Sequence, residues 1–432
     1  MKSFSQLDKQ LIWHPYTQHS IEDDPLIIKK AKNASLFTET DFQILDLISS
    51  WWTTTHGHSH SELNNALNDQ VANLEHVMFA GFTHPQAINL SKSLIESTPK
   101  NLKKVFFSDN GSTSIEVAIK MCLQFWKNKG SKEKNKFLVF EGGYHGDTVG
   151  AMSISKGSGF FNNYKDLLFG VCILPFPETW LCDEKKREKE DQSLVQIKKV
   201  IRENKNELCG LIIEPLLQGA GGMRMCSSSF LKKVTNIAHE NNILVVYDEV
   251  AVGFGRLGEL FACQKTETNP DILCLSKGLT AGYMPLAVTL CTNNIYDQFL
   301  SEDLAKTLLH GHTFTANPLA CAVANKSLQL FQEEKTLSRI ERINNKHLDF
   351  IKDLKASKKT LKERVAGSIL AFNIKQPNNH YKNNGSEDLR RFFIKKGLNI
   401  RPIGSCVYLM PPYCITDQEL DKTYNTLLEK FE

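Results

Sequence analysis

The chain has 432 residues, of which 41% are hydrophobic and 23% charged, and its formal net charge is +4. These values are ordinary for a globular enzyme, and without a long basic stripe they argue against a nucleic-acid-binding protein. No apolar run approaches the roughly 18 residues of a membrane span, and residues 1–10 lack the apolar core of a secretory signal.

Short apolar runs alternate with helical patterns through the middle of the chain. This alternation favours an α/β domain around a mostly parallel sheet. The strands predicted there are 105–108, 137–140, 210–214, 243–247 and 272–275, with helices at 112–127 and 228–240.

Helical patterns dominate after about residue 320, with short strands predicted at 369–374, 399–401 and 407–409. Thr416 and Glu419 have the spacing of a capping box that opens the last helix. The charged segment 183–206 is predicted to be a solvated loop and helix face. We expect a large domain over residues 49–330 and a smaller α+β domain built from residues 1–48 and 331–432.

The eleven cysteines include no C-x-x-C pair. Scattered, unpaired cysteines fit a reducing compartment, so a cytoplasmic protein with no membrane partner is expected. His56, His58 and His60 alternate along the chain, but no cysteines or carboxylates accompany them at ligand spacing, so we expect no metal.

An acid and a lysine follow two successive predicted strands and form the strongest constellation. Asp248 ends the run 243–247, and Lys277 follows the run 272–275. The carboxyl ends of parallel strands line the ligand crevice of an open sheet, so both side chains are expected in one site. A carboxylate keeps a pyridine nitrogen protonated, and a lysine amine forms an imine with an aldehyde cofactor.

Residues 253–258 match the G-x-G-x-x-G pattern of dinucleotide-binding proteins. A true fingerprint turns directly from a strand into a helix, whereas here residues 248–252 intervene. The segment that follows ends in Thr-Asn-Pro-Asp and makes a poor crossover helix. We therefore do not expect a nicotinamide cofactor.

Gly111, Ser112 and Thr113 join a predicted strand to a helix. A helix N-terminus with hydroxyl residues binds phosphate through free backbone N–H groups, although an ordinary N-cap has the same pattern. Thr313 is a candidate for one further hydroxyl. Tyr144, in a Gly-rich loop, and Val250 are candidates for covering the two faces of a cofactor ring.

These motifs together resemble the class III aminotransferases, which have the pyridoxal-phosphate-dependent fold type I. The resemblance covers nearly the whole chain and implies pyridoxal 5′-phosphate (PLP) as the cofactor, with Lys277 holding it and moving a proton, assisted by Asp248 and Tyr144. The matching segments are 109–116, 142–147, 214–215, 219–222, 248–256, 276–278, 313–318 and 401–402.

Segments 13–18, 49–52, 218–225 and 408–413 resemble the class III enzymes of biotin synthesis. That resemblance implies S-adenosylmethionine as amino donor and 8-amino-7-oxononanoate as acceptor. It also implies a homodimer with shared active sites, in which residues 311–313 reach the neighbour's cofactor. The residues implied in substrate binding are Tyr16, Trp51, Tyr144, Arg256, Gly311 and Arg401, and at most one of Trp51 and Trp52 is expected to face the site.

Two alternatives remain open at this stage. Met284, Pro285 and Leu286 resemble the wider class III group as much as the biotin enzymes, which leaves an aminotransferase that uses lysine, ornithine or another ω-amine. A regulator that merely holds PLP is the second alternative, and an intact pair of Asp248 and Lys277 argues against it.

Overall fold

A seven-stranded sheet forms the centre of the larger part of the molecule, with the strand order β4-β12-β11-β10-β7-β5-β6. Strand β12 runs antiparallel to both of its neighbours, and the other pairs are parallel. The predicted α/β class with a mostly parallel sheet is thereby confirmed. The strands are β4 (Leu102–Ser108), β5 (Lys136–Phe140), β6 (Cys172–Leu174), β7 (Leu208–Ile213), β10 (Leu244–Asp248), β11 (Ile272–Leu275) and β12 (Ala287–Thr292).

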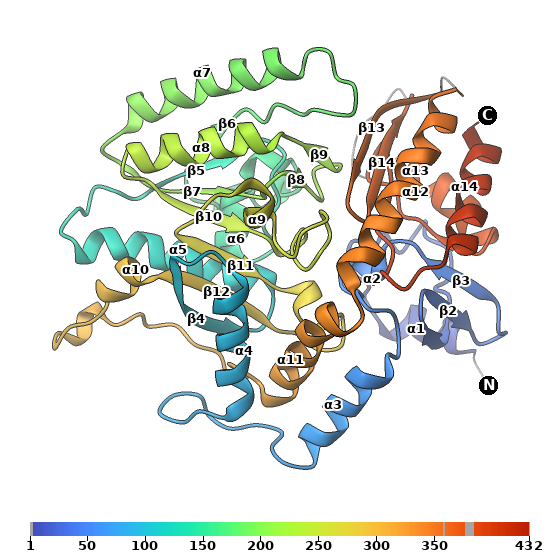
Figure 1. Cartoon of the computed structure of the whole chain (residues 1–432), viewed down its shortest axis with the longest axis horizontal. Coiled ribbons are helices and arrows are strands. Elements are labelled where there is room, and N and C mark those ends of the chain that lie inside the picture. Colours follow the sequence, from blue (N-terminus) through green and yellow to red (C-terminus); the bar gives the residue numbers. More distant parts are fainter. Residues whose placement is uncertain (1–2, 357–358, 376–383, 432) are drawn as a thin grey trace.

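Helices cover both faces of this sheet, and for that reason the central strands are continuous apolar runs. Every residue of β7, β10 and β11 is buried. Helix α5 (Gly111–Asn128) packs on one face, and α8 (Ser228–Glu240) on the other, under the charged outer helix α7 (Lys186–Asn204) (Figure 1). The predicted solvated helix face within 183–206 is confirmed, since few residues of α7 are buried.

Both chain ends contribute to the smaller part, which lies beside the large sheet (Figure 1). The strands β1 (Ile28–Lys32), β2 (Ser35–Thr38) and β3 (Gln43–Asp46) form one sheet with β15 (Leu398–Asn399), which runs parallel to β3. A second sheet joins β13 (Thr360–Ala366), β14 (Ile369–Ile374) and β16 (Cys406–Leu409). The domain boundaries near residues 48 and 330 stay a prediction.

The computed structural model describes residues 3–356, 359–375 and 384–431. Within those residues, no helix has the length and apolar content that would let it cross a membrane. The remaining helices are α1 (Phe4–Leu11), α2 (Ser49–Trp52), α3 (Ser61–Val71), α4 (Pro85–Ser97), α6 (Val149–Ile154), α9 (Ala262–Thr266), α10 (Asn293–Asp297), α11 (Pro318–Glu333), α12 (Thr336–Ala356), α13 (Asn384–Lys395) and α14 (Asp417–Phe431); the short strands β8 (Leu217–Gln218) and β9 (Arg224–Met225) pair with each other.

Two local predictions at the C-terminal end have different outcomes. The capping box is confirmed, because Glu419 N donates to Thr416 Oγ1 and Thr416 N donates to Glu419 Oε2. The strand predicted at 399–401 ends earlier, at Asn399. Ile400 N donates a hydrogen bond to Leu398 O instead of to a neighbouring strand, and Pro402 has no N–H to continue the strand pairing.

The segment labelled α2 is a left-handed turn. Its four residues have φ values of 49°, 44°, 72° and 72°. Left-handed backbone costs roughly 1–2 kcal/mol per non-glycine residue, so the surrounding structure must hold it. Ser49 Oγ donates to Met410 O (2.7 Å), and Trp52 Nε1 donates to Tyr408 Oη (3.0 Å). The C-terminal strand region thus fixes a turn near the N-terminus.

Candidate active site

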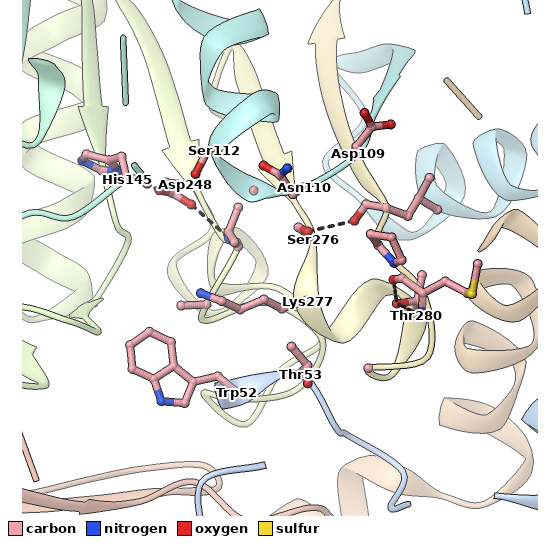
Figure 2. A pocket seen from close by; sticks show the side chains of 18 of the residues that line it. Trp52, Thr53, Asp109, Asn110, Ser112, His145, Asp248, Ser276, Lys277 and Thr280 are labelled. Atoms are coloured by element: carbon pink, nitrogen blue, oxygen red, sulfur yellow. Dashed lines mark hydrogen bonds and ion pairs between the residues drawn. The ribbon is translucent and has the colours of Figure 1, made fainter. Parts of the chain in front are cut away.

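A cavity of about 430 Å³ opens at the carboxyl ends of β10 and β11. Asp248 is the last residue of β10, and Lys277 follows the end of β11 by two positions. Both line the cavity, as the strand argument predicts. Figure 2 shows the Lys277 side chain between Trp52 and Asp248.

Lys277 occupies a left-handed conformation, with φ at 47°. Strained backbone of this kind persists where the surroundings determine it, and Ser276 Oγ donates to Leu286 O (2.8 Å) beside it. The Lys277 Nζ lies 4.6 Å from the ring centroid of Trp52. Burial lowers the pKa of the Lys277 amine, while the charges of Asp248 and Glu214 oppose that effect. The site therefore favours a neutral amine.

Asp248 is buried, and protein groups hold both of its carboxylate oxygens. Its Oδ2 lies 2.7 Å from His145 Nδ1, and its Oδ1 accepts from Val250 N (3.0 Å). Burial alone would lower the pKa of His145, but the hydrogen bond and the charge of Asp248 outweigh it and raise that pKa. The contact with His145 fixes the Asp248 carboxylate in place, and a carboxylate at this position suits a cationic ring nitrogen.

Glu214 is a second buried carboxyl group in the cavity wall. Its two oxygens accept from Tyr144 N (3.0 Å) and Gly219 N (2.9 Å). Burial raises the pKa of Glu214 to about 7, the charge of Asp248 adds to this, and His145 opposes it. The carboxyl group fixes two loops that border the cavity.

The N-terminus of α5 faces the same cavity through Gly111 and Ser112. No protein acceptor is recorded for either amide within the residues that the structure describes. Thr113 does not line the cavity, because its hydroxyl donates to Asn110 O and accepts from Asn110 N in a capping box. A Cβ on Gly111 would lie 2.5 Å from Val250 Cγ1, so glycine allows this close approach.

Two tyrosines meet above the cavity. Tyr144 lines it, and the hydroxyls of Tyr144 and Tyr16 both donate to Asp147 Oδ1, at 2.9 and 2.6 Å. The two hydroxyls are 3.2 Å apart. Burial raises the pKa of Tyr144, and the contacts with Tyr16 and Asp147 raise it further, so its hydroxyl keeps its proton.

Trp51 and Arg401 lie in the neighbouring cavities. A space of about 220 Å³ is bordered by Trp51, Trp52 and Arg401, and a larger one of about 580 Å³ shares Trp51 and Arg401. Both tryptophans border the smaller of these two cavities, whereas only Trp52 borders the Lys277 cavity, which agrees with the expectation that at most one of them faces the site. The Arg401 guanidinium lies 5.4 Å from the Trp51 ring centroid, and no ion pair to it is recorded in the described parts of the chain.

Besides Tyr16 and Thr113, three more residues from the sequence prediction line none of these cavities. The guanidinium of Arg256 is buried and donates to three carbonyl oxygens, one of them Pro411 O (3.0 Å). Gly311 and Thr313 are exposed in the loop before α11. Their roles in substrate and phosphate binding stay predictions.

Sequence reasoning missed three residues that border the Lys277 cavity. Trp52 was passed over in favour of Trp51, and Glu214 was noted only as part of a motif. His145 lies in the Gly-rich segment 142–147, but it is 103 residues away from Asp248 along the chain. The position of His145 between Tyr144 and Gly146, inside this Gly-rich segment, was the sequence feature that could have indicated a site residue.

The His56, His58 and His60 side chains each have a protein partner, namely Ser327 O, Asp46 and Glu334. Among the described residues, no three His, Cys, Asp or Glu side chains are grouped as metal ligands would be.

The donor set of the Lys277 cavity fits PLP. Lys277 supplies an amine for the aldehyde, Asp248 a carboxylate for the pyridine nitrogen, and the α5 N-terminus free amides for the phosphate. The volume of about 430 Å³ lies within the usual range of ligand pockets, roughly 300–1,000 Å³.

The chain is similar to known proteins along nearly its whole length. The family pattern described as "Aminotransferase class-III" matches residues 16–430. The adenosylmethionine-8-amino-7-oxononanoate aminotransferase of Synechococcus elongatus is 41% identical over 418 residues, which is 97% of each chain. The enzyme of the same name from Geobacter sulfurreducens is 39% identical over 96% of this chain and 94% of its own.

Solved structures agree with this similarity. The adenosylmethionine-8-amino-7-oxononanoate aminotransferase of Methanocaldococcus jannaschii superposes with a TM-score of 0.90 at 34% identity, over 98% of both chains. A PLP-bound amine transaminase from an uncultivated Pseudomonas species gives a TM-score of 0.92 at 26% identity, also over 98% of both chains.

Proposed function

Because the chain belongs to the class III aminotransferases, which use PLP, we propose that it converts 8-amino-7-oxononanoate to 7,8-diaminononanoate with S-adenosylmethionine as amino donor, a step of biotin synthesis. The donor's amino group replaces the ketone oxygen of the acceptor, and the donor leaves as the corresponding keto acid. The observation that carries this proposal is Arg401, a cation without a recorded ion-pair partner in the described residues, on the far side of an aromatic wall from Lys277.

PLP supplies an aldehyde that accepts an amino group and a ring that draws off electron density. In the proposal, the neutral Lys277 Nζ takes the proton from the carbon that bears the donor's amino group. Asp248 would accept a hydrogen bond from the ring nitrogen, with its carboxylate held in place by His145. The Gly111 and Ser112 amides would hold the phosphate.

Arg401 is placed to fix the acceptor's carboxylate by a two-pronged contact. The cavity of about 220 Å³ shares Trp52 with the Lys277 cavity and contains Trp51 and Arg401. The aromatic walls cover a methylene chain, which separates the ketone from the carboxylate in 8-amino-7-oxononanoate. Arg401 also suits the carboxylate of S-adenosylmethionine, so one cation serves both substrates in turn.

The test loads the protein with pyridoxamine 5′-phosphate and adds keto acceptors one at a time. Return of the absorbance of the PLP form with 8-amino-7-oxononanoate, but not with 2-oxoglutarate or pyruvate, is expected. Return with 2-oxoglutarate and none with 8-amino-7-oxononanoate would reject the proposal. It would favour instead an ω-amine transaminase, the kind of enzyme seen among the structural neighbours at 26% identity. S-adenosylmethionine and lysine are then compared as donors.

The proposed enzyme is a cytoplasmic homodimer. The loop that carries Gly311 and Thr313 is rich in exposed apolar side chains, with Leu304 and Leu309 more than 80% exposed. His76 packs on Phe314 of this loop, with ring centroids 5.0 Å apart, and so joins it to the exposed segment before α4. A second copy would cover this surface and receive Thr313 at its cofactor phosphate. Leu309→Asp should then shift the measured mass in solution from dimer to monomer; an unchanged mass would exclude this interface.

A further inference from the structure

We infer that Asp46, which lines none of the three cavities, is a positioning residue that fixes Trp51 and Arg401 relative to each other and so sets the preference for a carboxylate-bearing acceptor. This inference rests on the proposed function.

The Asp46 carboxylate is completely buried and accepts three hydrogen bonds. Oδ2 accepts from Ser50 Oγ (2.7 Å) and lies 2.8 Å from His58 Nε2, while Oδ1 accepts from Asn399 Nδ2 (3.0 Å). His58 is itself fixed, because its backbone N–H and C=O both pair with Asn33. One carboxylate therefore connects three separate segments of the chain.

Two of these segments carry the proposed carboxylate site. Ser50 precedes Trp51 within the left-handed turn, and Asn399 lies two positions before Arg401. Asp46 and Asn399 are also register partners in the parallel pair of β3 and β15. The hydrogen bonds of Asp46 thus hold the turn that carries Trp51 and the strand end that precedes Arg401. The side chains of Trp51 and Arg401 contact each other.

The left-handed turn makes this clamp necessary. Four consecutive left-handed residues are unfavourable and revert unless they are tied at several points. Ser49 and Trp52 are tied to the C-terminal region at the two ends of the turn, and Ser50 is tied to Asp46 between them. Loss of the Asp46 tie would leave Trp51 free to shift against Arg401. Burial would raise the pKa of Asp46, but its hydrogen bonds with His58 and Ser50 outweigh this and lower it, so the carboxylate stays ionised at working pH.

The experiment compares 8-amino-7-oxononanoate with its methyl ester as acceptors, because only the acid presents a carboxylate to Arg401. In Asp46→Asn, the preference for the acid over the ester, as the ratio of kcat/KM, should fall about tenfold through a higher KM for the acid. The ester should keep its kcat. A loss of preference through KM alone is not expected from a general structural defect, which would affect both acceptors.

Glu334→Gln is the matched control. It removes the carboxylate from the neighbouring histidine, since Glu334 Oε1 lies 2.9 Å from His60 Nε2, and Glu334 lines none of the three cavities. Its preference ratio should equal that of the wild type, even where its melting temperature falls as far as that of Asp46→Asn.

Ser50→Ala removes a single hydroxyl tie and serves if Asp46→Asn fails to fold; the preference ratio should fall about threefold. If a folded variant keeps the wild-type preference ratio, the inference about Asp46 is wrong, while the proposed function still stands. A wild type that uses acid and ester equally would remove the proposed role of Arg401, and the inference with it.

Discussion

His145 Nδ1 lies 2.7 Å from Asp248 Oδ2, and both side chains are buried. The histidine comes from the loop after β5, and the carboxylate from the end of β10. The hydrogen bond to this carboxylate and its charge raise the pKa of His145, although burial opposes the rise. The contact fixes the position of the Asp248 carboxylate in the cavity wall.

Replacing Asp248 by asparagine keeps the shape of the side chain and removes this charge. We expect turnover to fall roughly 10³-fold, since loss of a preorganised electrostatic partner costs several kcal/mol in the transition state. Steady-state kinetics with saturating cofactor measure the effect. Glu249→Gln is the control, because Glu249 is the next residue and also buried, but it does not line the cavity and accepts from Ala262 N and Cys263 N. Near-normal turnover in Asp248→Asn would refute the proposed pairing.

Borohydride reduction of the PLP-loaded protein should attach the cofactor to Lys277. The reason is the neutral amine that burial favours at this position. Peptide mapping by mass spectrometry locates the label. Lys265 provides an internal comparison, because burial lowers its pKa too, but its Nζ donates to Leu257 O (2.6 Å) outside the cavity. A label on Lys265 or on any other lysine would show that the cofactor site is misassigned.

The raised pKa of Glu214 predicts that the stability of the cofactor-free protein depends on pH. Its folded-state pKa of about 7 exceeds the ordinary value of 4.5, so the folded state binds the extra proton. Protonated Glu214 therefore stabilises the folded state below pH 4.5, and this contribution is lost as the pH rises through 7. The free energy of unfolding changes by up to about 3 kcal/mol over that range.

Glu214→Gln removes this dependence. The melting temperature of the variant, relative to wild type, should therefore be higher at pH 8 than at pH 5. Any constant penalty from the lost acceptor for Gly219 N cancels in that comparison. A difference that is the same at both pH values would contradict the raised pKa.

Arg401→Ala and Tyr16→Phe should differ in size of effect. Removing the guanidinium should raise KM for 8-amino-7-oxononanoate about 30-fold or more, as truncation of one partner of a charged pair typically costs about 2–5 kcal/mol. Tyr16→Phe removes one hydroxyl contact, worth about 1 kcal/mol. Arg391→Ala is the control, because Arg391 borders the outer cavity but is paired with Asp23 (2.7 Å). Equal losses in Arg391→Ala and Arg401→Ala would argue against a specific carboxylate site.

The sequence predicts well where strand geometry alone decides. Asp248 and Lys277 follow buried runs, and parallel strands bring their ends together, so the central pair could be located without coordinates. The α5 N-terminus follows from the same rule. The α/β class, the cofactor and the family resemblance follow from these residues and are confirmed.

The orientation or the hydrogen-bond partners of several site side chains could not be predicted from the sequence. The sequence did not indicate that Trp52 rather than Trp51 borders the Lys277 cavity, because both lie in a left-handed turn. The hydroxyl of Thr113 turns to Asn110, because capping competes for it with any ligand. Arg256 is the third case, since nothing in its motif indicates that backbone carbonyls surround its guanidinium.

The parallel pairing of β3 with β15 has a consequence for the order of assembly during synthesis. All strands of the large sheet lie between residues 102 and 292, so the Lys277 cavity is encoded well before the chain is finished. The turn at Ser49–Trp52 must wait for Met410 and Tyr408, which close it. A nascent chain folds from its N-terminal side as it emerges, so the region around Arg401 is the last to form. A chain that stops before Arg401 would carry Asp248 and Lys277, but it would lack both the guanidinium and the Tyr408 contact that holds Trp52 in the cavity wall.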